Sequence, residues 1–383
     1  MKRFIALACG IATLSTLHAQ EDYKYKVNIA TYDSAGCKYT PKKYEIKNFE
    51  KGQKPKNVIF FIGDGMGLSQ VFAALSANNG ELYLNQFTNF GFSKTHSADN
   101  YITDSAAGGT ALACGKKTRN GMIGMSPDSV AIPSLLELSD KAGLSTGLVA
   151  TVSIVHATPG SFIAHVPNRG QYEDIALSFL DTDIDVFIGG GSKFFKQRKD
   201  KRDLFKELEA KGYRMYESIE DAQNDNGQHI GILTTSEHMP IAATRKPSLE
   251  TSTQKAIDVL KQNENGFFVM IEGSQIDWGG HQNDIRDVIN ETLDLDKAIG
   301  KALEYAVNDG NTLIVVTADH ETGGLSVLGG SPEKGIVNGV FSTEDHSAVM
   351  VPVFAYGPGA EVFNGIYNNT EVFDKIRSLL LDK

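Results

Sequence analysis

This chain contains several continuous apolar runs of strand length. The clearest is Val58-Ile59-Phe60-Phe61-Ile62, and similar runs lie at residues 147–150, 186–188, 267–271, 313–316 and 351–355. A strand that is apolar at every position, rather than at alternate positions, must be covered on both faces. Amphipathic segments with a helical period lie between the runs, for example 252–261 and 285–307. This alternation predicts a three-layer α/β/α fold with a largely parallel central sheet.

The same pattern runs through most of the chain without a break. Residues 56–383 contain no repeat, no low-complexity segment and no linker rich in Pro, Gly or Ser, so we expect a single domain there. A polar arm rich in Lys and Tyr precedes it over residues 20–55. The helix over 252–261 is expected to stop at Asn265-Gly266, and the helix over 285–307 at Asp309-Gly310, because glycine favours the left-handed C-cap.

The first residues have the features of an export signal. Lys2 and Arg3 precede a short apolar stretch over 4–17, and Leu17-His18-Ala19 offers a small-residue cleavage site, which predicts a signal peptide over residues 1–19. The stretch is too short to span a bilayer comfortably. We therefore expect an exported protein, periplasmic or secreted, with no membrane span after signal removal.

Charge and cysteine content restrict the partners and the chemistry. The chain has 37 Lys and Arg against 47 Asp and Glu, a net charge of −10, and no basic run, so no nucleic-acid-binding surface is expected. Cys37 and Cys114 remain after signal removal. Export would permit a disulfide between them. The small apolar neighbours of Cys114 instead favour a packed helix and two unpaired thiols.

Polar residues follow several of the predicted strands directly. Such strand ends meet at one edge of a parallel sheet, where ligand sites form. The residues expected there are four carboxylates and three histidines: Asp64, Glu272, Asp277, Asp319, His281, His320 and His346. Taken singly, each could be a cap, a turn residue or a surface histidine. Together they would repel unless cations neutralised them, and mixed imidazole and carboxylate ligands suit zinc, whereas carboxylates alone suit magnesium.

Two further segments are candidates for the chemistry at this edge. Asp104-Ser105 has the pattern of a helix start, and a serine there, beside cations, would have a lowered hydroxyl pKa and backbone N–H groups directed at an anion. Arg169 offers a planar fork that matches two phosphate oxygens, although a surface ion pair is the simpler interpretation when it is considered alone. The Gly63-Asp64-Gly65-Met66-Gly67 segment lacks the ending of a P-loop and predicts a tight turn that presents Asp64.

Together these segments resemble the alkaline phosphatases. The matching stretches are NVIFFIGDGMG, YITDSAAGGTALACGKKTRNG, HATPGSFIAHVPNR, FFVMIEGSQIDWGGH, GNTLIVVTADHETGG and the His346 loop. The resemblance implies that residues 56–383 form the catalytic domain. It also implies that Ser105 is a nucleophile that becomes transiently phosphorylated, and that Arg169 clamps the phosphate. The metal sites implied are one zinc on Asp277, His281 and His346, a second zinc on Asp64, Asp319 and His320, and one magnesium on Asp64, Thr158 and Glu272.

The resemblance also implies a broad activity on small-molecule phosphate monoesters and the homodimer that is usual in the family. The chain departs from some family members at two positions near the substrate. It has His156 where they have Asp, and Trp278 where they have Lys; other members resemble this chain at both. The imidazole of His156 replaces a negative charge beside the expected magnesium ligands, so the affinity and specificity for magnesium do not follow from the resemblance. The loss of a cation at Trp278 predicts weaker retention of product phosphate, with simple packing in the wall of the site as the alternative.

Two alternatives are another hydrolase of the same superfamily, either a sulfatase or a phosphodiesterase, and a non-catalytic binding protein. A sulfatase would place its nucleophile in a Cys/Ser-x-Pro-x-Arg context, whereas Ser105 precedes Ala106-Ala107-Gly108. Phosphodiesterase relatives usually use Thr and lack the third metal. A non-catalytic zinc- or phosphate-binding protein of the same fold should have lost at least one nucleophile, clamp or ligand residue, and all of them are present in the sequence.

Overall fold

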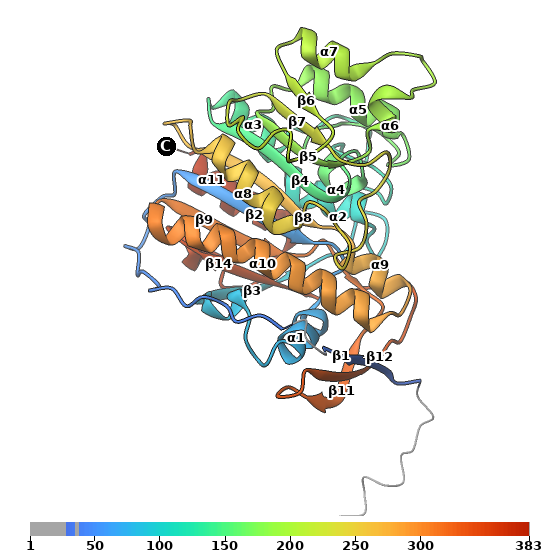
Figure 1. Cartoon of the computed structure of the whole chain (residues 1–383), viewed down its shortest axis with the longest axis vertical. Coiled ribbons are helices and arrows are strands. Elements are labelled where there is room, and N and C mark those ends of the chain that lie inside the picture. Colours follow the sequence, from blue (N-terminus) through green and yellow to red (C-terminus); the bar gives the residue numbers. More distant parts are fainter. Residues whose placement is uncertain (1–27, 35–37, 383) are drawn as a thin grey trace, which may run out of the picture.

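The computed structural model describes residues 28–34 and 38–382 and is built around one ten-stranded sheet (Figure 1). The strand order is β15-β3-β14-β9-β2-β8-β4-β5-β7-β6, and β14 alone runs against the direction shared by the others. The bounds are β2 (Asn57–Gly63), β3 (Asn89–Lys94), β4 (Ser145–Ser153), β5 (Val186–Gly190), β6 (Arg214–Tyr216), β7 (Ile230–Leu233), β8 (Phe267–Gly273), β9 (Thr312–Thr317), β14 (Val351–Tyr356) and β15 (Gly365–Asn368).

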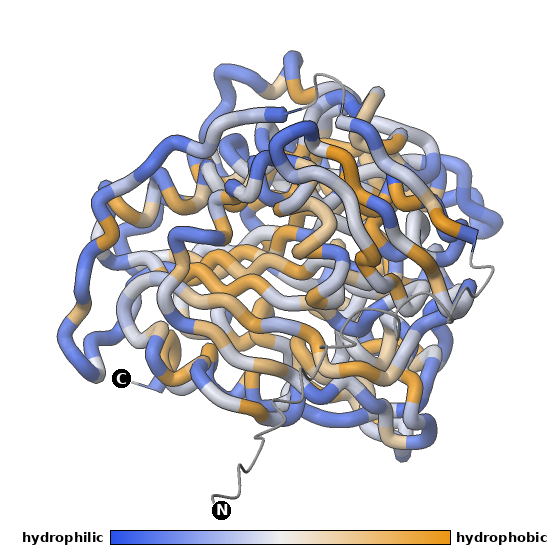
Figure 2. The backbone as a smooth tube through the Cα atoms, turned by 90° about the horizontal axis from the view of Figure 1, so that it is seen from below, coloured by the Kyte–Doolittle hydropathy of each residue, from blue (hydrophilic) through white to orange (hydrophobic). Residues whose placement is uncertain are grey.

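Helices cover both faces of this sheet. One face packs against α1 (Leu68–Ala77), α8 (Leu249–Leu260) and α10 (Ile285–Asp309); the other packs against α2 (Ser105–Cys114), α3 (Leu135–Lys141), α5 (Tyr172–Asp181), α7 (Leu204–Ala210) and α11 (Asn369–Leu380). The alternation is clear in β2, where Phe60 and Ile62 enter one core and Ile59 and Phe61 the other. The predicted three-layer fold is confirmed, and the apolar strands run through its centre in Figure 2.

All six apolar runs of the sequence are strands of the central sheet. The helix over 285–307 was also predicted correctly: α10 ends at Gly310, which has a φ of +73° in the left-handed region. The stop predicted at Asn265-Gly266 is wrong, because α8 ends at Leu260 with Lys261 as its C-cap. Gly266 has a φ of +107° for another reason: a Cβ there would lie 2.1 Å from the Lys56 carbonyl oxygen.

The described part of the arm lies against the α10 side of the molecule. Its strand β1 (Ala30–Asp33) pairs with β12 (Ile336–Val340), which also pairs with β11 (Ser326–Ser331) in a small antiparallel sheet. Further along, the hydroxyl of Tyr39 donates to the buried carboxylate of Asp296 on α10. The predicted signal peptide and Cys37 lie outside the described residues, and Cys114 is a buried free thiol in α2.

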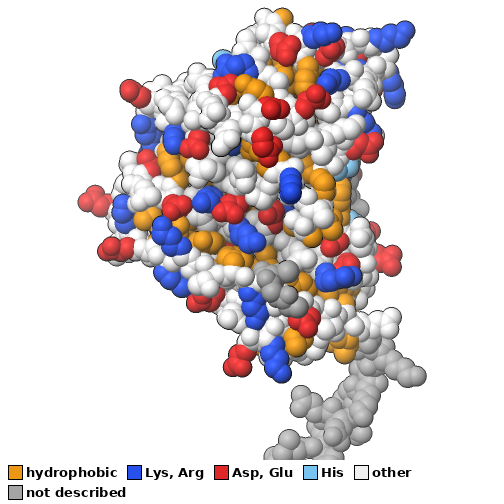
Figure 3. All heavy atoms as spheres, in the orientation of Figure 1, with side chains coloured by type: hydrophobic (Ala, Val, Ile, Leu, Met, Phe, Trp, Pro, Cys, Tyr) orange, Lys and Arg blue, Asp and Glu red, His pale blue; other side chains and the backbone are white. Residues whose placement is uncertain are grey.

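The surface of the molecule carries charges of both signs. On the face drawn in Figure 3, Lys and Arg side chains are interspersed with Asp and Glu. Within residues 28–34 and 38–382, no helix is both long enough and apolar enough to cross a membrane.

Short elements complete the frame around the carboxyl ends of the strands. They are α4 (Ala157–Gly160), α6 (Lys193–Lys196), α9 (Ile276–His281), β10 (Glu321–Thr322), β13 (His346–Ser347), η1 (Tyr83–Gln86) and η2 (Ala360–Phe363). The pairing of β10 with β13 joins Thr322 to His346 and brings the His346 segment to the sheet edge.

Candidate active site

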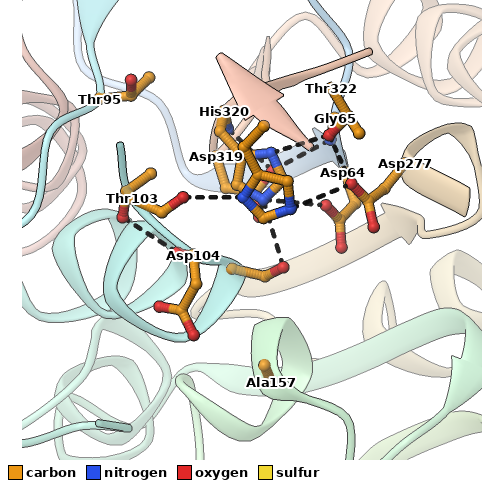
Figure 4. A network of polar contacts seen from close by, with 12 residues as sticks. Asp64, Gly65, Thr95, Thr103, Asp104, Ala157, Asp277, Asp319, His320 and Thr322 are labelled. Carbon is orange, nitrogen blue, oxygen red and sulfur yellow. Dashed lines mark hydrogen bonds and ion pairs between the residues drawn. The ribbon is translucent and has the colours of Figure 1, made fainter. Parts of the chain in front are cut away.

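The three central strands deliver acidic residues to one point. Strands β8 and β9 flank β2, with Ile62 in register with both Glu272 and Thr317. Asp64 follows β2 and Asp319 follows β9, so these two carboxylates and Glu272 come from adjacent strand ends. All three are essentially buried. Figure 4 shows Asp64 and Asp319 with His320 at this edge of the sheet, where the sequence led us to expect them.

Asp64 is presented by a tight turn. Gly65 has a φ of +74°, and a Cβ there would lie 2.7 Å from the Cα of Asp277. The close approach of these two backbones therefore requires glycine. The Gly65 amide also donates to Asp319 Oδ1 at 3.3 Å, which fixes one carboxylate relative to the other.

One cluster joins α9 to the loop strand β13. Asp277 Oδ1 lies 3.4 Å from both His281 Nε2 and His346 Nε2, and the two Nε2 atoms lie 3.2 Å apart. The Nδ1 atoms donate to backbone carbonyls of Glu344 and Thr103, at 2.6 and 2.8 Å. These bonds place the ring proton on Nδ1 and leave the Nε2 lone pairs directed into the cluster, which is the tautomer a metal ligand needs.

A second cluster surrounds His320. Its Nε2 lies 3.4 Å from Asp64 Oδ1 and 3.3 Å from Asp319 Oδ2. Asp64, Asp277 and His320 each offer a ligand atom, and these atoms lie within 4.8 Å of one another; the atoms of Asp277, His281 and His346 meet the same limit. Asp277 therefore lies between the two clusters. Both sets supply imidazole nitrogen and carboxylate oxygen at coordinating range.

Ser105 is the first residue of α2 and faces the second cluster. Its Oγ lies 3.3 Å from His320 Nε2, and the residue is 2 % exposed. The helix starts where the Asp104-Ser105 pattern predicted, and Asp104 rather than the serine caps it by accepting from the Ala107 amide at 3.0 Å. The hydroxyl therefore lies at a helix N-terminus, where backbone N–H groups favour an anion.

Arg169 lies on the other side of Asp104. Its Nη1 donates to Asp104 Oδ2 at 3.1 Å, and its side chain is 28 % exposed. The guanidinium is therefore partly accessible beside the nucleophile helix. The charge of Asp104 outweighs burial and raises the pKa of Arg169, so the group stays cationic.

A third set of oxygen atoms is buried without hydrogen-bond partners. The set comprises Asp64 Oδ1, Thr158 Oγ1, Glu272 Oε1 and Asp319 Oδ2. Thr158 is close enough to Glu272 to lower the pKa of its carboxyl, but no hydrogen bond of ordinary geometry joins them. Unsatisfied buried oxygens are costly in a folded protein. Cations would satisfy them, so the residues present fit the metal ligands expected from the sequence.

The electrostatics of the site lead to the same conclusion. Burial and the neighbouring carboxylates raise the pKa of Asp64 well above its usual range, and burial raises the pKa of Glu272 to about 8 and that of Asp319 to about 7. At Asp277 burial acts in the same direction, but the contacts with the imidazole rings of His281 and His346 outweigh it and lower the pKa. Burial and mutual repulsion therefore disfavour the charged forms of several of these acids, and bound cations would offset both effects.

His156 and Trp278 lie beside the site, since the charge of Arg169 acts on His156 and Trp278 directly follows Asp277. Burial and the charge of Arg169 lower the pKa of His156 to about 3, so its ring is neutral. Trp278 is half-buried, and its ring meets the edge of His238 at a centroid distance of 4.9 Å. His238 also contacts His156, at 5.6 Å. Sequence reasoning missed His238, because it lies in a loop after β7 with no motif around it.

Comparisons with known proteins identify the family. The alkaline phosphatase family model matches residues 55–341. The chain is 35% identical to alkaline phosphatase 4 of Bacillus subtilis, over 88% of this chain and 92% of that protein. It is 30% identical to the alkaline phosphatase of Escherichia coli, over 85% of this chain and 86% of that protein. The solved alkaline phosphatase from the Antarctic bacterium TAB5 superposes with a TM-score of 0.81 at 42% identity, covering 85% of this chain and 98% of that one. This chain belongs to the alkaline phosphatase family and is a phosphomonoester hydrolase.

Proposed function

We propose that this protein is a metal-dependent alkaline phosphatase of broad specificity that works through a phosphoserine on Ser105. The observation that carries the proposal is the position of the Ser105 hydroxyl. It lies at the N-terminus of α2, 3.3 Å from His320 Nε2 and beside a helix cap that also holds Arg169. A nucleophile, an anion-binding helix end and a phosphate-binding guanidinium therefore meet at one point.

The proposed chemistry has two displacements at phosphorus. The Ser105 oxygen attacks the phosphorus atom, the ester P–O bond breaks, and the alcohol leaves with a proton. Water then attacks the phosphoserine and releases inorganic phosphate. Arg169 and the first N–H groups of α2 hold the phosphoryl oxygens through both steps, because charge on these oxygens must be balanced in each transition state.

We assign the metals as the resemblance implies. Asp277, His281 and His346 would hold one zinc ion; Asp64, Asp319 and His320 a second; and Asp64, Thr158 and Glu272 a magnesium ion. When bound, the zinc ions would stabilise the attacking and leaving oxygens and would lower the pKa of the attacking hydroxyl. The partnerless buried oxygens and the Nδ1-bonded histidines support these assignments. A variant of the TAB5 enzyme is described with magnesium bound in a site called M3.

We also propose export and a homodimer. Export is based on the predicted signal peptide over residues 1–19, and it leaves the arm over 20–55 and the catalytic domain over 56–383 as the mature protein.

The dimer would use an apolar groove of about 960 Å³ with well-exposed Leu68, Tyr101, Val349 and Ile366 along it. A second copy would remove these side chains from water. Light scattering of wild type and Tyr101→Asp tests this, and a wild-type monomer at micromolar concentration would contradict it.

The activity is tested with p-nitrophenyl phosphate at alkaline pH. The mature protein is assayed as isolated, after EDTA, and after zinc and magnesium are restored, with Ser105→Ala alongside. We expect loss with EDTA, recovery with metal, and almost no turnover by the variant. Zinc binding without turnover would indicate a binding protein instead, and turnover indifferent to EDTA and to Ser105→Ala would mean that the site is elsewhere.

A further inference from the structure

One buried threonine hydroxyl contacts a residue of each of the two clusters described above. Thr322 Oγ1 donates to Asp277 Oδ1 and lies 3.2 Å from His320 Nδ1 (Figure 4). Asp277 belongs to the cluster that joins α9 to β13, and His320 is the imidazole of the other cluster. Because all three side chains are buried, bulk water does not compete for these bonds.

The direction of the two bonds follows from the chemistry of the groups. A carboxylate that binds a metal is ionised and only accepts, so the single hydroxyl proton of Thr322 goes to Asp277. The Thr322 oxygen then offers only lone pairs to His320, whose Nδ1 must carry the proton between them. The proton-free nitrogen of His320 is therefore Nε2, which lies 3.4 Å from Asp64 Oδ1 and 3.3 Å from Asp319 Oδ2. This is the tautomer that a metal ligand needs.

The surrounding backbone holds Thr322 in one orientation. Its amide donates to the Gly65 carbonyl at 3.2 Å, and its carbonyl accepts from Gln70 Nε2 at 2.8 Å. The backbone of α9 packs against its methyl group, since a Cβ at Gly280 would lie 2.9 Å from Thr322 Cγ2. A β-branched side chain also has few rotamers. The hydroxyl is therefore fixed relative to both clusters by the fold itself.

We propose that Thr322 is a positioning residue shared by the two zinc sites. Its hydroxyl holds the Asp277 carboxylate for one zinc ion and selects the Nε2 ligand form of His320 for the other. The proposal rests on the zinc sites assigned under the proposed function and goes beyond them, because Thr322 is a ligand of neither ion. Groups that hydrogen-bond to metal ligands typically contribute roughly 10- to 100-fold to metal affinity. Loss of this one hydroxyl should therefore weaken both sites together.

The test measures zinc binding rather than turnover. The mature protein is stripped with EDTA, equilibrated with excess magnesium, and titrated with zinc in buffers whose competing chelator sets the free zinc concentration. Bound zinc is then counted by elemental analysis. Thr322→Val has the shape of threonine without the hydroxyl, and we expect it to need roughly tenfold more free zinc, or more, to fill either site. Thr322→Ala removes the same hydroxyl with less bulk beside Asp277 and should show the same loss, whereas Thr322→Ser keeps the hydroxyl and should restore most of the affinity.

Thr312→Val is the matched control. Thr312 is also buried, and its hydroxyl makes the same pair of bonds: it donates to Asp309 Oδ2 at 2.6 Å and accepts from Asn57 Nδ2 at 3.0 Å. It is the first residue of β9, at the opposite end of that strand from Asp319. Thr312→Val should therefore lower stability without changing zinc affinity.

Several outcomes would overturn the proposal. They are equal zinc affinity in the wild type and the variants without the hydroxyl, a loss confined to one of the two ions, a loss of the same size in Thr322→Ser, and a loss that Thr312→Val reproduces. A wild type that binds no zinc would refute the metal assignment and this proposal with it. Zinc binding that depends on Thr322, in a protein that does not hydrolyse p-nitrophenyl phosphate, would support the proposal and refute only the proposed function.

Discussion

Arg169 and Asp104 form an ion pair that ties the guanidinium to the start of the helix carrying Ser105. One carboxylate oxygen of Asp104 accepts from Arg169 Nη1 at 3.1 Å and from the Gly121 amide at 3.0 Å. The other accepts from the Ala107 amide at 3.0 Å and caps α2. A single side chain therefore sets both the helix N-terminus and the position of the group proposed to hold phosphate.

Asp104→Asn should weaken phosphate binding while leaving the helix capped. The amide oxygen can still accept from Ala107, but its NH₂ group faces Arg169 and offers no charge. Loss of a hydrogen bond between charged groups predicts roughly a tenfold rise in the competitive inhibition constant for inorganic phosphate. Asp203→Asn is the control, because Asp203 caps α7 and pairs with Lys206. In Figure 1, α7 lies at the edge of the molecule, apart from α2. Equal inhibition constants in wild type and Asp104→Asn would contradict the prediction.

Trp278→Lys should tighten product inhibition. The new ammonium would lie near Arg169 and the phosphoryl oxygens, and a second cation favours the dianion. We expect the inhibition constant for phosphate to fall by roughly threefold or more. Trp278→Phe keeps an aromatic ring against His238 without adding charge and should behave like the wild type. An inhibition constant unchanged by Trp278→Lys would show that Trp278 serves only to pack the wall.

Glu272→Gln should have opposite effects on the stability of the fold with and without bound metal. In metal-free protein the variant removes one of several buried carboxyl groups and should raise the free energy of unfolding by about 1 kcal/mol. With zinc and magnesium added, the wild type should gain more stability than the variant, because a ligand has been lost. Glu291→Gln is the contrasting control, since Glu291 is buried but paired with Arg245 at 2.6 Å, and it should be destabilising in both conditions. Thermal unfolding of the wild type and the two variants, with and without EDTA, measures all six states, and lower metal-free stability for Glu272→Gln would contradict the prediction.

His165 provides a pH-dependent contribution to stability away from the metals. Its Nε2 lies 3.0 Å from Glu137 Oε1 and its Nδ1 2.6 Å from the Gly124 carbonyl, so the protonated ring donates to both. The bond to Glu137 raises the pKa of His165 in the folded protein above its value in the unfolded chain. The bond therefore stabilises the fold fully at pH values below the pKa of the unfolded chain, and this stabilisation is lost as the pH rises through the pKa of the folded protein. His165→Gln should therefore lower the free energy of unfolding, measured with urea, by about 1 kcal/mol near pH 6 and by less near pH 9. A cost that grows with pH would contradict this.

The strands were predictable where apolar residues are continuous and less so at the sheet edge. Strands β2 and β8 are buried along their whole length, so their sequences are apolar throughout. Strand β3, which lies next to the edge strand β15, has exposed positions and reads Asn-Phe-Gly-Phe-Ser-Lys, which gives no such run. Its place in the sheet depends on pairing with β14, more than 250 residues later.

The site was predictable to the extent that its residues follow strands or helix starts. Asp64 and Asp319 lie together because their strands are neighbours in the sheet, and the sequence could indicate that. His238 and Tyr172 gave no such signal. Each reaches His156 from a loop or a helix start outside the strand ends, and only the three-dimensional packing of those segments brings the rings into contact.

The proposed mechanism requires that the Ser105 oxygen becomes phosphorylated during turnover. The most direct measurement is to quench the enzyme with acid during hydrolysis of p-nitrophenyl phosphate and to map the modified peptide by mass spectrometry. We expect one added phosphoryl group on Ser105, none on Ser105→Ala, and none after EDTA treatment. Sustained turnover with no phosphorylated Ser105, or with the phosphoryl group on another residue, would contradict it.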